Sequence, residues 1–430
     1  MATTVEVGAT RRPERGWTGG LVAASLFAFV VLGVPDGMLG VAWPAVRHGF
    51  GLPLAALGEL LVALLIGYLC ITSITGRCLR RFGTGTVLLA SAVAGTAGAG
   101  LFASSPSWAG VVGAAWLLGV AGGGVDAGLN TVVALDGDSR LMNLLHGCYG
   151  IGAACGPLVV TVALVATSTW RPAYLALMML EAVLAVTWVA LRNRFPRLPP
   201  ASDDRSSESS LPAESENDPV SPGSSARRGI LVLSFGVFFF AAALESTTAS
   251  WAASYLRGPV GLSAVWAGLA VFVFEAGLTV GRMTAALISP RWIPERIARL
   301  GIVGSVMGSA ALWADPGAAA TVVALGLLGF TLGPVFPALM LLTPVRLGQQ
   351  TAVHAVGWQL AAAATGGVGV AAVVGVVLQE VGLGGFGPVL VVLALLLGSL
   401  VLASERKAVP ALRDDQGLGV GLASGVTATG

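Results

Sequence analysis

The sequence predicts an all-α integral membrane protein with twelve transmembrane helices in two six-helix pseudo-repeats. Hydrophobic residues fill 55% of the 430 positions, charged residues fill 11%, and the mean hydropathy of +0.83 lies far above that of a soluble domain. Apolar stretches of roughly 20 residues, the length that crosses a bilayer, recur along the chain. Lipid offers the backbone no hydrogen bonds, so each stretch is predicted to be a helix and open sheets are excluded.

Short polar segments separate the apolar stretches, which fall into two sets of six. The predicted helices of the first set cover 21–41, 54–75, 86–103, 109–135, 141–167 and 172–191. Those of the second set cover 229–255, 264–288, 297–313, 318–342, 353–378 and 384–403. Between the sets lies a segment rich in Ser, Pro, Glu and Asp, which buries too little apolar surface to fold alone. The chain is therefore divided into a cytoplasmic arm (1–20), an N-terminal half (21–195), a disordered cytoplasmic linker (196–228), a C-terminal half (229–405) and a disordered cytoplasmic tail (406–430).

The placement of arginine predicts the orientation, because cytoplasmic loops retain basic residues. The gaps after odd-numbered helices hold only Arg47, Arg171 and Arg257. Both termini and the linker are therefore expected on the cytoplasmic side of the inner membrane, which requires an even number of helices. The gaps after even-numbered helices hold the larger set, which comprises Arg77, Arg80, Arg81, Arg140, Arg192, Arg194, Arg197, Arg291, Arg296, Arg299 and Arg346.

The two halves are predicted to correspond position by position. Asp36 lies in the first helix of one half and Glu245 in the first helix of the other. The second helix of each half runs into a Gly-Arg pair, ending in Arg77 and Arg282, and both arginines are expected at the inner end of the helix. Parallel repeats of this kind enclose a binding site near the middle of the membrane.

Carboxylates inside the apolar helices are the main indication of function. An ionisable side chain at a helix centre costs about 2.5 to 3.5 kcal/mol on insertion scales, so several together are expected to face water or carry protons. Arg282 is expected at a helix end, too far out to neutralise them, and burial without a cation favours the protonated form. Proton coupling is therefore the mechanistic hypothesis. The alternative is a hydrogen-bonded structural acid, and Glu181 fits that alternative best. The proton-coupling candidates are Asp36, Asp126, Glu245 and Glu275.

Polar and aromatic residues in the same helices are candidates for solute binding. Asp126 and Asn130 are four residues apart, so they share a helix face and combine an acid with an amide, the donor and acceptor set that suits a hydroxyl-bearing ligand. The alternative is a buried polar pair beside the packing glycines 122–124. The complete candidate set for substrate binding is Asp36, Asp126, Asn130, His146, Tyr149, Trp251, Tyr255, Phe272, Trp358 and Gln359.

Several motifs occur in an order shared with one group of transporters. They are VPDGMLGVAWP around Asp36, RCLRRFG after the second helix, the acid followed four residues later by Asn130, NLLHGCYGIGAACGP, ESTTASWAASYL, and GPVFPALMLLTP with WQLAAAATGG. On these residues the chain resembles the fucose permease-like proton:sugar symporters of the major facilitator superfamily, over most of both halves. The resemblance implies alternating access, with Asp36 and Asp126 taking part in proton coupling and sugar binding. The chain departs from the fucose transporter in having Asp126 rather than Glu and His146 in place of an amide.

One motif favours a different direction of transport. GIGAACGP contains Gly152, Gly156 and Pro157 and resembles part of the antiporter motif of proton-driven drug exporters. Small residues permit close helix approach, so these three are predicted to form a gate at which the two halves meet, with Arg77 and Arg81 at its inner end. Symport of a sugar-like solute is the leading hypothesis, and proton-coupled efflux of a small organic molecule is the alternative.

Other function classes receive less support from the sequence. A nontransporting membrane receptor remains an alternative, whereas an enzyme needs a nucleophile and base, or a bound metal, at one depth in the membrane. The three His and four Cys residues have no metal-binding or disulfide spacing. We therefore expect no metal and no cofactor beyond the proton gradient, and no nucleic-acid partner. The expected partners are a small solute, protons and the lipid bilayer, with the protein acting as a monomer.

Overall fold

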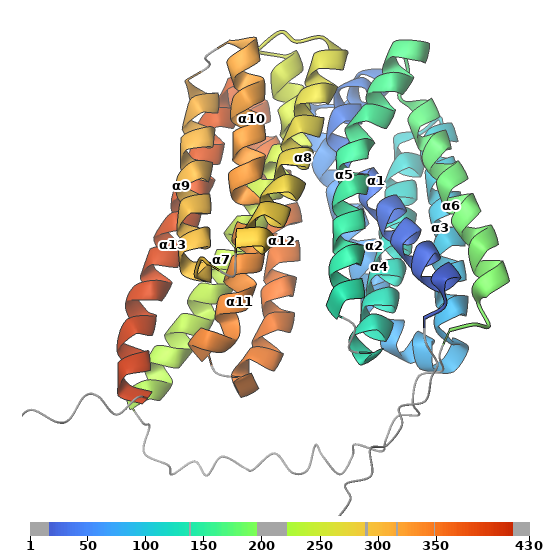
Figure 1. The fold of residues 1–430 in the computed structure, drawn as a ribbon. Helices are drawn as coiled ribbons and strands as arrows, with labels where there is room; N and C mark the ends of the chain where they lie inside the picture. The colour runs from blue at the N-terminus through green and yellow to red at the C-terminus, as the bar shows by residue number, and fades with distance from the viewer. Residues whose placement is uncertain are drawn as a thin grey trace, which may run out of the picture.

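The computed structural model describes residues 17–136, 139–195, 222–288, 291–314, 317–347 and 349–415, which form helices and no strands (Figure 1). The N-terminal half contains α1 (Gly19–Phe50), η1 (Leu54–Ala56), α2 (Leu57–Phe82), α3 (Thr84–Ser104), α4 (Trp108–Asp136), α5 (Ser139–Thr167) and α6 (Arg171–Leu191). The C-terminal half contains α7 (Pro222–Arg257), α8 (Ala264–Ile288), α9 (Pro294–Trp313), α10 (Ala318–Leu332), α11 (Val335–Leu347), α12 (Gln349–Val381), η4 (Leu383–Gly385) and α13 (Phe386–Asp415).

These elements make twelve membrane helices. Eleven segments of the described chain are long and apolar enough to cross a bilayer, and α10 and α11 together form one of them, Ala318–Leu347. The twelfth is α9, a 20-residue helix whose first turns carry Glu295, Arg296 and Arg299 and so lower its hydropathy. The fold is therefore the predicted all-α membrane bundle.

The structure differs from the sequence prediction mainly at helix ends. α1 continues through Pro44 to Phe50 and is capped by Gly51 in the left-handed conformation (φ 64°), where glycine avoids the Cβ clash. α7 begins at Pro222, inside the predicted linker, and α13 continues to Asp415, inside the predicted tail. Hydropathy marks only the part of a helix that lipid surrounds, so it misses turns that extend into the polar region. The rest of the predicted linker and tail lies outside the described residues.

The two halves repeat the same packing. α1 packs on α5 and α2 on α4 in the first half, as α7 packs on α12 and α8 on α10 in the second. Between the halves, α5 packs on α8, α2 on α12, and α1 on α7. α1 and α7 begin, and α6 and α13 finish, at one end of the bundle (Figure 1). We call this the linker end and the opposite one the far end.

Glycine contacts establish which positions of the halves are equivalent. A Cβ on Gly152 of α5 would lie 1.9 Å from the carbonyl oxygen of Val30 of α1, and a Cβ on Gly366 of α12 would lie 2.2 Å from that of Phe239 of α7. Asp36 and Glu245 each follow their contacted residue by six positions. The predicted correspondence of these two acids therefore agrees with the helix packing.

The contact at Gly152 leads to a stability prediction. Gly152→Ala places a methyl group against the backbone of α1, so we expect it to lower the free energy of unfolding by about 2 to 3 kcal/mol. The measurement is the thermal unfolding midpoint in detergent. Gly147→Ala on the same helix is the control, because a Cβ there meets no atom within 4 Å, and it should unfold at the wild-type temperature or slightly above. Equal midpoints for the two variants would contradict the packing.

Candidate functional site: a central cavity between the halves

A cavity of about 570 Å³ lies between the two halves. Its wall comes from α1, α2, α3, α4, α5 and α6 on one side and from α7, α8, α11 and α12 on the other. Most of the lining is aliphatic or aromatic, and the polar side chains are concentrated on a few helices. The titratable and charged groups in the lining are Asp36, Tyr68, Asp126, His146, Tyr149, Tyr174, Glu245, Glu275 and Arg282.

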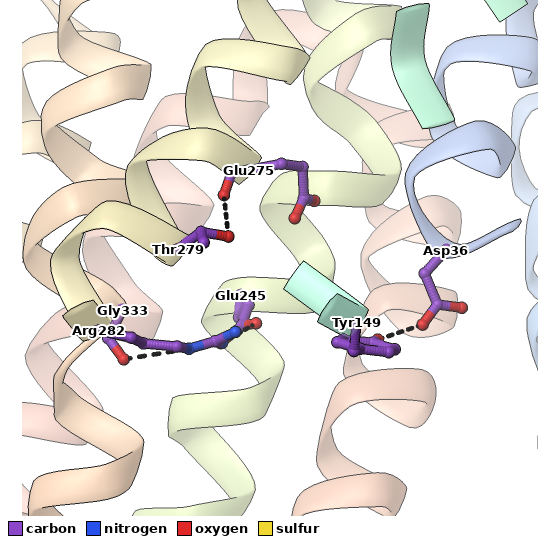
Figure 2. Close-up of polar contacts among 7 residues, drawn as sticks. All are labelled: Asp36, Tyr149, Glu245, Glu275, Thr279, Arg282 and Gly333. Atoms are coloured by element: carbon purple, nitrogen blue, oxygen red, sulfur yellow. Dashed lines mark hydrogen bonds and ion pairs between the residues drawn. The ribbon is translucent and has the colours of Figure 1, made fainter. Parts of the chain in front are cut away.

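Asp36 faces the cavity from the middle of α1. Its carboxylate accepts a hydrogen bond from the hydroxyl of Tyr149 on α5 (Figure 2). The two helices approach closely enough for this contact because Gly33 lies under the Tyr149 backbone, where a Cβ would come within 2.1 Å of the carbonyl oxygen. Both predicted residues therefore lie in the cavity and contact each other.

Asp126 is held by two donors. The Tyr68 hydroxyl of α2 donates to Oδ2 at 2.6 Å, and the Asn130 amide, one turn further along α4, donates to Oδ1 at 2.8 Å. The predicted pairing of Asp126 with Asn130 is therefore present, but Asn130 supports the acid without itself lining the cavity. Tyr68 was missed by the sequence analysis, because it lies 58 positions away from its partner in the chain.

Glu245 forms an ion pair with Arg282, at 2.7 Å between the glutamate Oε1 and the guanidinium Nη2. The prediction that no basic residue lies deep enough to meet the buried acids is therefore wrong. α8 continues six residues beyond Arg282 to Ile288, so the arginine lies inside the helix and not at its end. The predicted equivalence with Arg77 is not reflected in their surroundings, since Arg77 is exposed near the linker end of α2 whereas Arg282 lines the cavity.

The position of Arg282 is fixed by a break in the tenth membrane helix. Its Nε donates to the carbonyl oxygen of Gly333 at 3.3 Å (Figure 2). In a continuous helix this carbonyl would accept from the backbone of residue 337, but Pro337 has no N–H, and α10 ends just before Gly333. The sequence GPVFP thus leaves the Gly333 carbonyl free to accept a hydrogen bond from the guanidinium. This Pro-containing motif is the feature of the sequence from which the contact could have been predicted.

Glu275 of α8 is the fourth predicted acid in the cavity. The residue is 8% exposed, and its carboxylate makes no hydrogen bond or ion pair with the described part of the chain. The hydroxyl of Thr279 donates to the backbone carbonyl of Glu275, not to the side chain, at 3.2 Å. Figure 2 shows the carboxylate directed towards the space between α8 and the Asp36–Tyr149 pair.

His146 lines the cavity on the linker side of Tyr149. It is exposed, and its ring meets that of Phe29 edge-on at 5.6 Å between centroids. The cavity thus brings together six of the predicted site residues: Asp36, Asp126, His146, Tyr149, Glu245 and Glu275.

Five other predicted contact residues lie outside the cavity wall. The Trp251 indole donates to the carbonyl of Ala371 at 2.9 Å, and the Tyr255 hydroxyl donates to that of Leu312 at 3.1 Å, so both pack within the C-terminal half. Gln359 is fully buried and hydrogen-bonds to Ser234 and Thr343. Trp358 is 69% exposed on the outer surface and Phe272 is half-buried. A solute in the cavity therefore does not touch these residues in the described conformation.

The comparisons with known proteins agree with this geometry. A family model described as Major Facilitator Superfamily matches residues 25–372, which is most of the chain and runs from the N-terminal half into α12 of the C-terminal half. The chain belongs to the Major Facilitator Superfamily. No curated protein sequence matches it. Its family indicates that the protein is a transporter.

Three solved transporter structures show the same fold. A variant of the nucleoside transporter NupG covers 90% of this chain and 99% of its own, with a TM-score of 0.69 at 14% identity. A bacterial homologue of the human lysosomal transporter Spinster, inward-facing and unoccupied, covers 92% and 99%, with a TM-score of 0.70 at 11% identity. The peptide transporter POT in complex with sulfate covers 92% and 97%, with a TM-score of 0.67 at 15% identity. At these identities the likeness concerns the fold alone.

The residues predicted to form the gate between the halves are Gly152, Gly156, Pro157, Arg77 and Arg81. Gly152 and Gly156 contact Val30 and Val34 of α1, and the Pro157 ring lies against Gly37, so these three residues pack α5 within the N-terminal half. Gly150, the first residue of the motif, faces the other half, because a Cβ there would lie 2.7 Å from the hydroxyl of Thr279 on α8. Arg77 and Arg81 are exposed near the linker end of α2, and Arg81 stacks over Phe82 at 5.4 Å.

The contacts between the halves that close the cavity lie at the far end. A Cβ on Gly40 of α1 would lie 2.2 Å from the carbonyl oxygen of Ala249 of α7, and a Cβ on Gly58 of α2 would lie 3.1 Å from the Cβ of Ala372 of α12. The backbone N–H of Ala55 donates to the Gln379 side chain at 3.0 Å. All these contacts lie beyond the acids of the cavity on the far side, so they close that end.

One buried acid of the transporter lies apart from the cavity. Glu181 of α6 is 8% exposed and packs on Gly95 of α3, where a Cβ would come within 2.5 Å of the carboxyl carbon. Its Oε2 has no hydrogen-bond partner in the described residues.

In the part of the chain that the structure describes, no group of three or more His, Cys, Asp or Glu side chains is arranged to hold a metal ion.

Proposed function

We propose that this transporter moves a small organic solute across the inner membrane by proton-coupled alternating access through the central cavity. The observation that carries the proposal is that carboxylates from both halves face one cavity between them. As the two halves rock against each other, side chains in a cavity between them become exposed first to one side of the membrane and then to the other. The driving force is the proton gradient, and no other cofactor is required.

Protons are proposed as the coupling ion because of the charge balance in the cavity. Four carboxylates face one guanidinium, which leaves three carboxylates in excess. Each uncompensated charge is expensive in a cavity that closes within the membrane, since desolvation opposes it. Binding protons removes that cost, so protonation and closure of the cavity favour each other.

Arginine placement supports a cytoplasmic linker end. With that orientation, the contacts around Gly40 and Gly58 close the cavity towards the outside. The described conformation is then inward-facing, with the wall continuing past Tyr149 to the exposed His146. We propose that the protein works as a monomer in the bilayer, since one chain supplies both halves of the cavity.

Import and export are both compatible with this mechanism. The resemblance to sugar symporters favours the uptake of a sugar-like solute. One observation favours the efflux alternative: the described lining contains no Asn, Gln or Trp side chain, the groups that most often hydrogen-bond to or stack on sugars. Movement of no solute in either direction would instead favour a nontransporting receptor.

Asp126→Asn tests the proton coupling. Asparagine keeps the shape of the side chain but carries no titratable proton, so we expect solute accumulation driven by a pH gradient to fall to equal concentrations on both sides, while solute exchange without a gradient persists. The assay uses proteoliposomes with an imposed pH gradient, labelled monosaccharides and organic amines, and a trapped pH indicator. Glu59→Gln is the control, because Glu59 lies at the far end and accepts from the Trp108 indole at 2.7 Å, outside the cavity wall. Undiminished uphill transport by Asp126→Asn would refute the proton role of this acid.

A further inference from the structure

Among the four acids that line the cavity, Glu275 is the one whose carboxylate no donor in the described residues satisfies. It is more than nine-tenths buried, lines the cavity, and has no donor in the described part of the chain. The other three acids each have a donor: Tyr149 for Asp36, Tyr68 for Asp126 and Arg282 for Glu245. A buried carboxylate without a partner costs more than a satisfied one, so this position favours a bound cation or proton.

The surroundings of Glu275 reinforce the demand for positive charge. The groups that face it are Glu245 on α7, Asp36 on α1, Tyr149 on α5 and Arg282 on its own helix. α10, which packs on α8, carries no titratable residue. The one nearby cation, Arg282, is already engaged by Glu245 and by the Gly333 carbonyl. An anionic solute would therefore meet an excess of carboxylates.

The walls determine what kind of cation fits. Leu61, Leu64 and Leu118 line the N-terminal side, and the half-buried rings of Tyr68 and Phe336 lie on either side of the cavity. Aliphatic walls suit an apolar body, and aromatic faces attract a cationic head group. A small hydrated metal ion would leave these walls unused, and a polyol would find few neutral amide partners.

We propose that the cavity binds an organic cation with an apolar body, held by Glu275 with Asp36, in competition with a proton. This inference rests on the proposed function and makes it more specific. Because the cation and the proton neutralise the same carboxylate, one must leave before the other binds. Competition of this kind makes the coupled movement an exchange, with protons entering as the cation leaves.

The test is binding of benzyltrimethylammonium to the purified full-length protein, measured by calorimetry over a range of pH. Competition with one proton predicts that the apparent Kd rises by up to about tenfold for each pH unit that the pH is lowered. Glu275→Gln should weaken binding by about tenfold or more and flatten this dependence. Benzyl alcohol, benzoate and galactose are the neutral, anionic and polyol comparisons, and each should bind more weakly than the cation.

Glu181→Gln is the matched control, because it removes another buried, unpartnered carboxylate outside the cavity and should leave cation binding unchanged. Asp36→Asn provides a second variant should Glu275→Gln not fold. Absent cation binding, equal binding by Glu275→Gln, or binding that is independent of pH would each overturn the inference. Transport assays in proteoliposomes distinguish failure of this inference from failure of the proposed function. If galactose moves together with protons and the protein binds no organic cation, only the inference is rejected. Cation binding without any proton-driven movement would reject only the coupling.

Discussion

A disulfide between Gly58→Cys and Ala372→Cys should abolish transport, and reduction should restore it. The two positions lie on α2 and α12, and their Cβ atoms would be 3.1 Å apart, slightly closer than the roughly 3.5 to 4.5 Å of a relaxed disulfide. Alternating access requires the halves to separate at the far end, because that is the contact which closes the cavity on this side. A covalent bond there holds the protein in one conformation, so net transport should fall to the background of empty liposomes.

This experiment needs a background without Cys70, Cys78, Cys148 and Cys155, all of which are free thiols. The matched control is Gly98→Cys with Leu117→Cys, which joins α3 to α4 within the N-terminal half at the same 3.1 Å distance. That disulfide should form equally well and leave transport intact. Full activity of the crosslinked 58–372 protein, with crosslinking verified by mass spectrometry, would show that the far end does not open during transport.

The number of helices and the depth of the acids follow from the sequence because they depend on local properties. Roughly 20 apolar residues define a span wherever it lies, and an acid within such a span must face protein or water. Asp36, Asp126, Glu245 and Glu275 all line the shared cavity, whereas their part in proton coupling stays a prediction. Helix ends were less accurate, since a helix such as α7 continues into the polar region where hydropathy gives no signal.

The partners of the acids required three-dimensional information. Tyr68 and Asp126 are 58 positions apart, and Glu245 and Arg282 are 37 apart, so only helix packing brings them together. Trp251 and Tyr255 were misplaced for a different reason: their residue types suit solute binding, but their face of α7 points to Ala371 and Leu312. Ser246, Ala249 and Ser250 form the face that lines the cavity. The residue type identifies a candidate for solute binding, whereas the rotation of the helix about its axis determines whether that side chain faces the cavity.

Breaking the Glu245–Arg282 pair is expected to be the most destabilising change in the cavity. Removal of one partner leaves the other without its hydrogen-bonded counter-charge at 2.7 Å, at a cost of about 3 to 5 kcal/mol when the pair is fully buried. These side chains are 29% and 31% exposed to the cavity, so water recovers part of that cost. We expect Glu245→Gln and Arg282→Gln each to lower the free energy of unfolding by about 2 to 3 kcal/mol.

A double-mutant cycle measures the interaction energy between Glu245 and Arg282 separately from the contribution of each side chain alone. In Glu245→Gln with Arg282→Gln neither charge remains uncompensated, so the loss should be smaller than the sum of the two single losses by about 1.5 kcal/mol or more. Denaturant unfolding in detergent provides the four free energies. Arg299→Gln is the control, because Arg299 is 59% exposed in its ion pair with Glu405 and should contribute less than about 1 kcal/mol. If the two single losses simply add, Glu245 and Arg282 do not stabilise each other. Arg282 would then be stabilised by the carbonyl of Gly333 alone. The carboxylates of the cavity would in that case be neutralised by protons even when no solute is bound.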